Sequence, residues 1–143
     1  MGVPIAVAEL ESAVLDACAA EAEWPARVAA GIYAGVDFAI ARPHVVEAVS
    51  LGADPVHDYE RLIGRFAGFI QVRAPVDKRL PGTPDETLVA GIVGMVGDHV
   101  RLGRTERLSE LRADLVLLTL LPYLGFAEAQ EWANRVEKEP PRP

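Results

Sequence analysis

The sequence predicts an all-α protein, a helical bundle of about six or seven helices. Apolar residues recur at spacings of three and four along successive segments, as they do on one face of an α-helix. Proline stands near the start of several of these segments, where a helix needs no backbone donor. No stretch alternates apolar and polar residues for long enough to form a sheet. These observations favour helices that pack against helices.

The first half of the chain divides into four predicted helices. The first covers Pro4–Glu21, and the second covers Trp24–Ala41. Arg42-Pro43 ends the second helix, because a residue before proline is pushed out of the helical region. A short helix over Pro43–Leu51 follows, and then a longer one from Pro55 to about Arg73.

The stretch Leu80–Glu131 organises the second half of the chain. Thr83 and Glu86 form a capping box at the start of a helix predicted over Pro84–Leu102. Glycines recur at every third position of this helix, at Gly91, Gly94 and Gly97. Each glycine weakens a helix by roughly 1 kcal/mol relative to alanine. We therefore expect this glycine strip to allow close approach by another backbone.

The next helix, predicted over Arg112–Leu124, is apolar on nearly all sides. It is shorter than the ~20 residues that a bilayer span needs, so we expect an interface between two chains instead. Ser109 is predicted to cap this helix, and Pro122 to kink or strain its last turn. Gly125 is predicted to take a left-handed conformation before a final helix over Phe126–Lys138.

Length and charge limit the classes of function. The 143 residues suit a single domain over residues 1–139, followed by an extended, disordered proline-rich tail at 140–143. The net charge of −7 disfavours direct contact with nucleic acid or an anionic membrane surface. The lone Cys18 excludes an internal disulfide and fits a small buried apolar side chain. No signal peptide is recognisable, so we expect a cytoplasmic protein with no membrane contact.

Motifs that would indicate catalysis or a cofactor are not found. The sequence has no nucleophile elbow, no phosphate-binding loop with a following lysine, and no zinc-binding histidine pair. His44 and Glu47 share a helix face but lack further ligands for a metal, and His57 is expected at the surface. His99 fits either an exposed helix position or a buried position at a dimer interface. We expect no enzyme, no cofactor and no metal site.

The order of elements resembles the C-terminal ligand-sensing domain of TetR-type transcriptional repressors. The resemblance is carried by an apolar helix with glycine at its middle, a leucine-rich helix that ends in Leu121-Pro122-Tyr123-Leu124-Gly125, and a short helix with Glu128-Ala129. It is clearest over Leu80–Glu131. Family members carry a helix-turn-helix domain before this region, and nothing before Pro4 corresponds to it. We therefore expect DNA contact only through an N-terminal domain absent from this chain.

The resemblance implies a homodimer that binds a small hydrophobic effector. The two pairing helices would form a four-helix bundle with their partners, through Ala90, Gly91, Gly94, Gly97, Leu117 and Leu121. The effector would lie among the earlier helices, where most aromatic residues fall. We place it against Tyr33, Val36, Leu62, Phe66 and Phe69.

Two other functions fit the same residues. A helical protein–protein module would use the glycine strip and the leucine-rich helix to bind a different partner, with the aromatic residues serving only as core. A small enzyme is the other alternative, although the sequence shows no nucleophile with a matching base.

Overall fold

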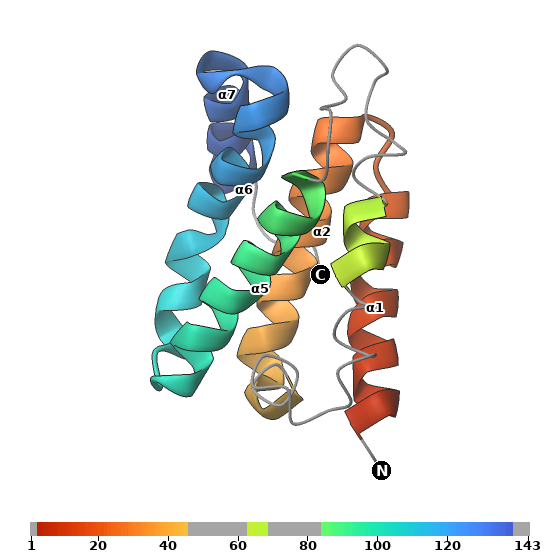
Figure 1. The fold of residues 1–143 in the computed structure, drawn as a ribbon. Coiled ribbons are helices and arrows are strands. Elements are labelled where there is room, and N and C mark those ends of the chain that lie inside the picture. The colour runs from red at the N-terminus through yellow and green to blue at the C-terminus, as the bar shows by residue number, and fades with distance from the viewer. Residues whose placement is uncertain (1–2, 46–62, 69–83, 139–143) are drawn as a thin grey trace.

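The computed structural model describes residues 3–45, 63–68 and 84–138, and every regular element in these ranges is helical (Figure 1). No strand occurs within these three ranges. The predicted all-α class is therefore confirmed. The predicted tail at 140–143 lies outside the described residues.

The helices of the first half follow from local sequence signals. Helix α1 covers Val3–Ala19 and α2 covers Trp24–Ala41, with Pro25 in the first turn of α2. Arg42 leaves the helical region, at φ −135° and ψ 64°, as expected for a residue before proline. Of the two helices predicted next, only residues 43–45 and 63–68 are described, and both segments are helical.

The helices of the second half also begin and end close to the predicted positions, except that the helix predicted from Arg112 begins at Leu108, four residues earlier. They are α5 (Pro84–Arg101), the 3₁₀ turn η2 (Thr105–Arg107), α6 (Leu108–Leu124) and α7 (Phe126–Lys138). Gly125 has a positive φ of 82°, which glycine favours, but its ψ of 168° lies outside the left-handed helical region that was predicted. Its N–H donates to the carbonyl of Leu121 at 3.0 Å. Thr83, the predicted capping residue of α5, lies outside the described residues.

One capping prediction was wrong. Ser109 does not cap α6, because η2 leads directly into the helix and Ser109 already lies in its first turn. The hydroxyl of Ser109 instead points back to the carbonyl oxygen of Glu106, 3.4 Å away. Pro122 lies inside α6, which continues to Leu124.

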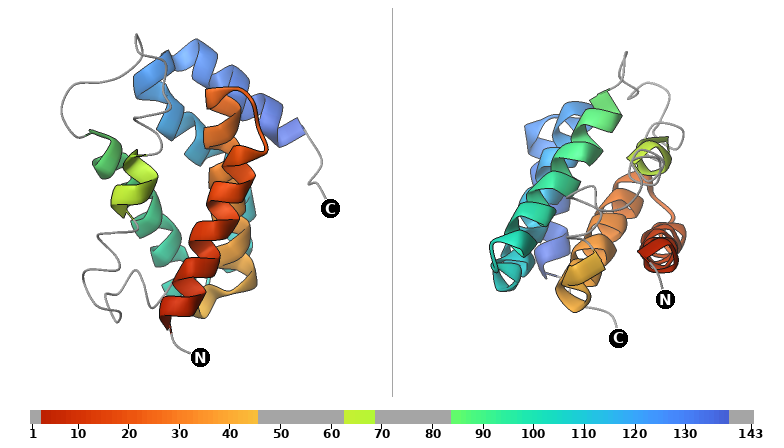
Figure 2. Two further views of the ribbon diagram at one scale, coloured as in Figure 1. Left: turned by 90° about the vertical axis from the view of Figure 1, so that its right-hand side faces the viewer. Right: turned by 60° about the horizontal axis from the view of Figure 1, so that its bottom comes forward.

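Helix α2 is the centre of the described fold. It lies between α1 on one side and the neighbouring helices α5 and α6 on the other, as Figures 1 and 2 show from three directions. Helix α7 packs against α6 and the start of α2. An ion pair between Arg65 and Glu11, at 2.9 Å, joins segment 63–68 to α1.

The buried side chains form two clusters. The larger, here called the Trp24 cluster, joins α2, α6, α7, segment 63–68 and the first half of α5; its buried members are Trp24, Val28, Ala29, Ile63, Ala67, Val89, Val116, Leu120, Tyr123, Ala129 and Ala133. The smaller, here called the Val36 cluster, joins α2 to the second half of α5 and the start of α6; it contains Val36, Ala39, Val96, Val100, Leu108 and Leu115. Ile32 packs against both clusters.

Helices α1 and α2 approach each other closely at Gly31. A β-carbon at this position would lie 2.7 Å from the sulfur of Cys18 and 3.5 Å from a methyl carbon of Val14. Cys18 is 3% exposed, which confirms its predicted burial. The absence of a side chain at Gly31 is therefore what allows α1 to pack this closely on α2.

Candidate functional site

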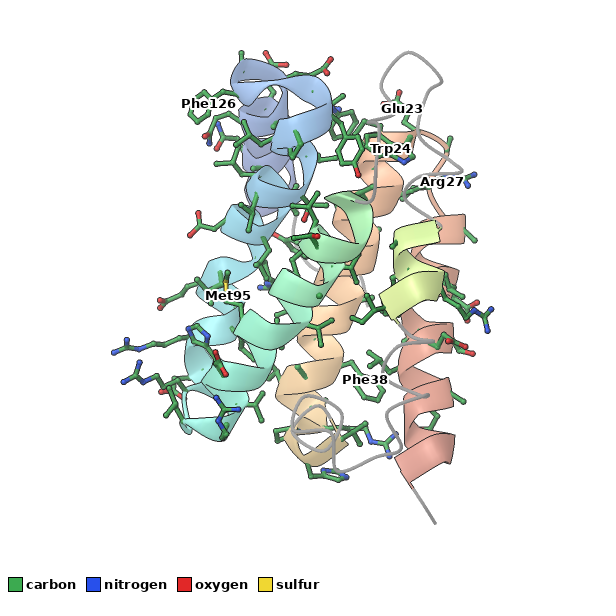
Figure 3. The ribbon with its side chains drawn as sticks, viewed as in Figure 1. Glu23, Trp24, Arg27, Phe38, Met95 and Phe126 are labelled. Carbon is green, nitrogen blue, oxygen red and sulfur yellow. The ribbon has the colours of Figure 1, made fainter. Side chains whose placement is uncertain are left out.

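Two aromatic rings lie at the centre of the Trp24 cluster. Trp24, at the start of α2, packs edge to face against Tyr123, near the end of α6, with ring centroids 5.2 Å apart and planes at 70°. Figure 3 labels Trp24 at the end of α2 nearest α7. Both residues are buried, and the other buried members of the cluster are aliphatic. The described part of the cluster is therefore an apolar environment with few polar groups.

The hydroxyl of Tyr123 is buried and has no hydrogen-bond partner among the described residues. Tyr123 is 6% exposed, so bulk solvent does not reach this hydroxyl. Thr119, one turn earlier on the same helix, is also buried, but its hydroxyl donates to the carbonyl of Leu115 at 2.8 Å. Of these two hydroxyls on α6, only that of Tyr123 keeps an unused capacity for hydrogen bonding.

The predicted ligand-binding residues fall into separate places. Tyr33 and Phe66 are half-buried and pack against the Trp24 cluster. Val36 is 2% exposed and belongs to the Val36 cluster instead. Leu62 and Phe69 lie outside the described residues. The structure thus brings two of the five residues to one apolar cluster and places a third in another.

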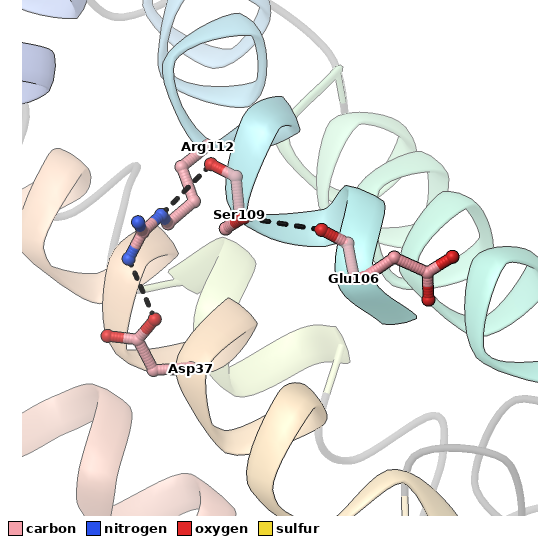
Figure 4. A network of polar contacts seen from close by, with 4 residues as sticks. All are labelled: Asp37, Glu106, Ser109 and Arg112. Atoms are coloured by element: carbon pink, nitrogen blue, oxygen red, sulfur yellow. Dashed lines mark hydrogen bonds and ion pairs between the residues drawn. The ribbon is translucent and has the colours of Figure 1, made fainter. Parts of the chain in front are cut away.

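A polar network connects α2 to α6 (Figure 4). The guanidinium carbon of Arg112 is 4.7 Å from the centroid of the Tyr33 ring. The same guanidinium group donates to a carboxylate oxygen of Asp37 at 2.9 Å and to the carbonyl of Ser109 at 3.2 Å. Arg112 therefore joins α6 to α2 through a cation–π contact with Tyr33 and an ion pair with Asp37.

The six residues predicted for dimerisation also divide by exposure. Ala90 and Leu117 are half-buried and pack against the Trp24 cluster, and Gly97 is buried. Gly91 and Leu121 are exposed, and Gly94 is half-buried. A β-carbon at Gly91 or Gly94 would meet no atom within 4 Å, so this part of the glycine strip has open space beside it.

Large apolar side chains are also exposed on α5 and α6. Met95 on α5 is 37% exposed, and Leu118 and Leu121 on α6 are 41% and 37% exposed. Met95 follows Gly91 by four residues and Leu121 follows Leu118 by three, so each pair shares one side of its helix. We name the set Gly91, Gly94, Met95, Leu118 and Leu121 the pairing surface. In Figure 3, Met95 lies on the side of the molecule formed by α5 and α6.

The histidines give no indication of a metal site in the described part of the chain. No group of three or more His, Cys, Asp or Glu side chains gathers there. His99 is half-buried, with its Nδ1 atom 2.9 Å from the carbonyl oxygen of Met95, and His44 is exposed. His57 and Glu47 lie outside the described residues.

The Trp24–Tyr123 pair was not predicted as a site from the sequence. Trp24 was expected in the aromatic first half, whereas Tyr123 belonged to a helix predicted for pairing. The relevant signal was a tyrosine placed just after a leucine-rich run, because a phenol in such a run brings a polar atom into an apolar core.

Comparison with known proteins gives no match to a family model, a curated protein or a solved structure. A search for membrane spans found that none of the described helices combines the length and the apolar character needed to cross a bilayer.

Proposed function

We propose that this chain is the ligand-sensing and dimerisation domain of a TetR-like transcriptional regulator. In this proposal two copies pair through α5 and α6, and a small apolar effector binds in the Trp24 cluster. The chain carries the sensing and pairing functions of such a regulator. The observation that carries the proposal is that α6 has buried residues in the Trp24 cluster and exposed residues on the pairing surface.

The two sides of α6 have different surroundings. Val116, Leu120 and Tyr123 are buried in the Trp24 cluster. Leu118 and Leu121 are exposed on the pairing surface. A ligand that moves the buried side of α6 therefore also moves its exposed side, because a helix shifts as a rigid element. This arrangement supports a sensor in which ligand binding and pairing affect each other.

Substitution of Gly94 by leucine tests the pairing surface. The new side chain enters open space within one chain, so Gly94→Leu is expected to fold normally. Between two chains it would hold the helices apart, and we expect the dimer dissociation constant to rise by about tenfold or more. Analytical ultracentrifugation over a range of concentrations measures this constant.

Gly64→Leu is the matched control for this experiment. Gly64 is also a helical glycine with no atom within 4 Å of a β-carbon, but it lies in segment 63–68. Gly64→Leu is expected to leave the dimer unchanged. Equal dimerisation of both variants would show that the pairing surface is not where the chains meet, and a monomeric wild-type protein would exclude the homodimer altogether.

Native mass spectrometry of the untreated protein tests ligand binding separately. A dimer with a small-molecule mass that disappears on denaturation is the expected result. The alternative function, a helical protein–protein module, predicts no such mass and a monomer that exposes Met95, Leu118 and Leu121 to a hydrophobic dye.

A further inference from the structure

We propose that the hydroxyl of Tyr123 is the polar anchor of the ligand site, and that the ligand is an uncharged, mainly apolar molecule with one hydrogen-bonding oxygen. This inference rests on the proposed sensing function and names the chemistry of its ligand. It is carried by the buried, unpartnered hydroxyl of Tyr123 within the Trp24 cluster.

The position of this hydroxyl favours a ligand over an unused side chain. A buried polar group without a partner carries a free-energy penalty that phenylalanine at the same position would avoid. Trp24 packs edge to face against the Tyr123 ring and restricts its orientation, so the hydroxyl cannot turn freely toward solvent. A ligand oxygen in the cluster would remove the penalty, since a phenol both donates and accepts hydrogen bonds.

The surroundings of Tyr123 determine the charge of the ligand. The buried side chains that share its cluster are a tryptophan and the aliphatic residues of α2, α5, α6, α7 and segment 63–68. None of these buried side chains could neutralise a charge, so an ionised ligand would lose its hydration without compensation. An uncharged molecule with an apolar body and one oxygen matches both the apolar wall and the single hydroxyl.

Bound water is a weaker explanation for the same hydroxyl. A buried water is stable when it has two to four polar partners. Among the buried side chains of the described cluster, only Tyr123 and Trp24 carry a polar atom, and the others offer none. A ligand can satisfy the hydroxyl with one oxygen and gain the rest of its binding free energy from apolar contact.

Two probes of nearly equal shape test the anchor. Acetophenone carries a carbonyl oxygen, and α-methylstyrene carries a methylene group at the same place. We expect the wild-type protein to bind acetophenone about 2- to 10-fold more tightly, as one hydrogen bond to a buried hydroxyl predicts. Isothermal titration or ligand-observed NMR measures both affinities.

The variant Tyr123→Phe should lose the preference for acetophenone, because it keeps the ring and removes the hydroxyl that would pair with the carbonyl oxygen. Thr119→Val, which removes the neighbouring hydroxyl that already has a partner, should retain the preference for acetophenone. Failure of the wild type to bind either probe, or the same preference in Tyr123→Phe as in wild type, would overturn the inference.

Stability without any probe gives a second, independent readout. Because the Tyr123 hydroxyl is unpartnered, Tyr123→Phe should have a urea midpoint at or above that of the wild type. Thr119→Val should have a lower midpoint, because it loses the bond to Leu115. A similar decrease in both variants would show that the Tyr123 hydroxyl is already paired and would overturn the inference. The dimer measurements on Gly94→Leu would still decide the pairing part of the proposed function.

Discussion

Burial changes the chemistry of individual side chains, and Cys18 shows this most directly. The side chain is 3% exposed where α1 meets α2. Burial raises the pKa of the Cys18 thiol from 9.0 to about 11, because the thiolate loses its hydration, and nearby Arg27 offsets only part of this effect. At neutral pH the sulfur is a neutral apolar group that fills the space left by Gly31.

This burial predicts slow alkylation of Cys18 in the folded protein. A pKa higher by two units lowers the thiolate fraction at pH 8 by about 100-fold, so labelling by iodoacetamide should slow by at least that factor relative to protein in urea. Mass spectrometry of timed samples measures both rates. Similar rates in the two conditions would mean that the thiol is accessible.

The same pKa gives a pH dependence of stability with a defined sign. The folded state holds the Cys18 proton more tightly than the unfolded state does. The associated stability is therefore fully present below pH 9 and is lost as the pH rises toward 11. Relative to Cys18→Ala, which lacks this group, the wild type should lose urea resistance across that interval.

At the scale of elements, α1 and α2 approach each other closely at Gly31. The sequence predicted such an approach at Gly91 and Gly94 on α5, where the structure has open space within the chain. That prediction concerned a second chain and stays a prediction, whereas the close approach at Gly31, against Cys18 of α1, was not predicted. Spacing of glycines along one helix could not reveal this contact, because it depends on which helix lies opposite.

Gly31→Ala is predicted to destabilise the protein by about 1–3 kcal/mol, since its β-carbon would overlap the sulfur of Cys18 at 2.7 Å. Gly35→Ala, one turn later on α2, is the matched control. A β-carbon there would lie 3.6 Å from a methyl carbon of Val14, which is an ordinary contact, and alanine favours the helix by about 0.5–1 kcal/mol. Urea unfolding measures both. Equal stability of the two variants would argue against the close approach at Gly31.

The sequence predicted helix ends correctly where the residue that marks the end acts through its own backbone. Pro25, Arg42 and Gly125 act through their own backbone geometry, and the helix ends they mark lie at or next to the predicted positions. The prediction that Ser109 caps α6 was wrong because the 3₁₀ turn η2 leads into the helix before Ser109. The Trp24–Tyr123 contact joins the start of α2 to the end of α6, so no periodicity within either helix could predict it.

At the scale of the whole molecule, α6 belongs to both the proposed ligand site and the proposed pairing surface. Its buried residues help to form the Trp24 cluster, and its exposed residues form part of the pairing surface. Arg112 also connects α6 to α2 through Tyr33 and Asp37, so a shift of α6 is transmitted to the central helix. In the proposed sensor, such a connection would make ligand binding and pairing interdependent, and linkage would require the dependence to be reciprocal.

The final prediction is that ligand strengthens pairing. A ligand bonded to Tyr123 would hold α6 in one position. Less conformational entropy of α6 is then lost when a second chain docks on Leu118 and Leu121. We expect saturating acetophenone to lower the dimer dissociation constant by about fivefold or more, as measured by ultracentrifugation. Tyr123→Phe should show a smaller change, because the apolar contacts remain and the hydroxyl is lost. A dissociation constant that is the same with and without the probe would show that the ligand site and the pairing surface act independently, although both belong to α6.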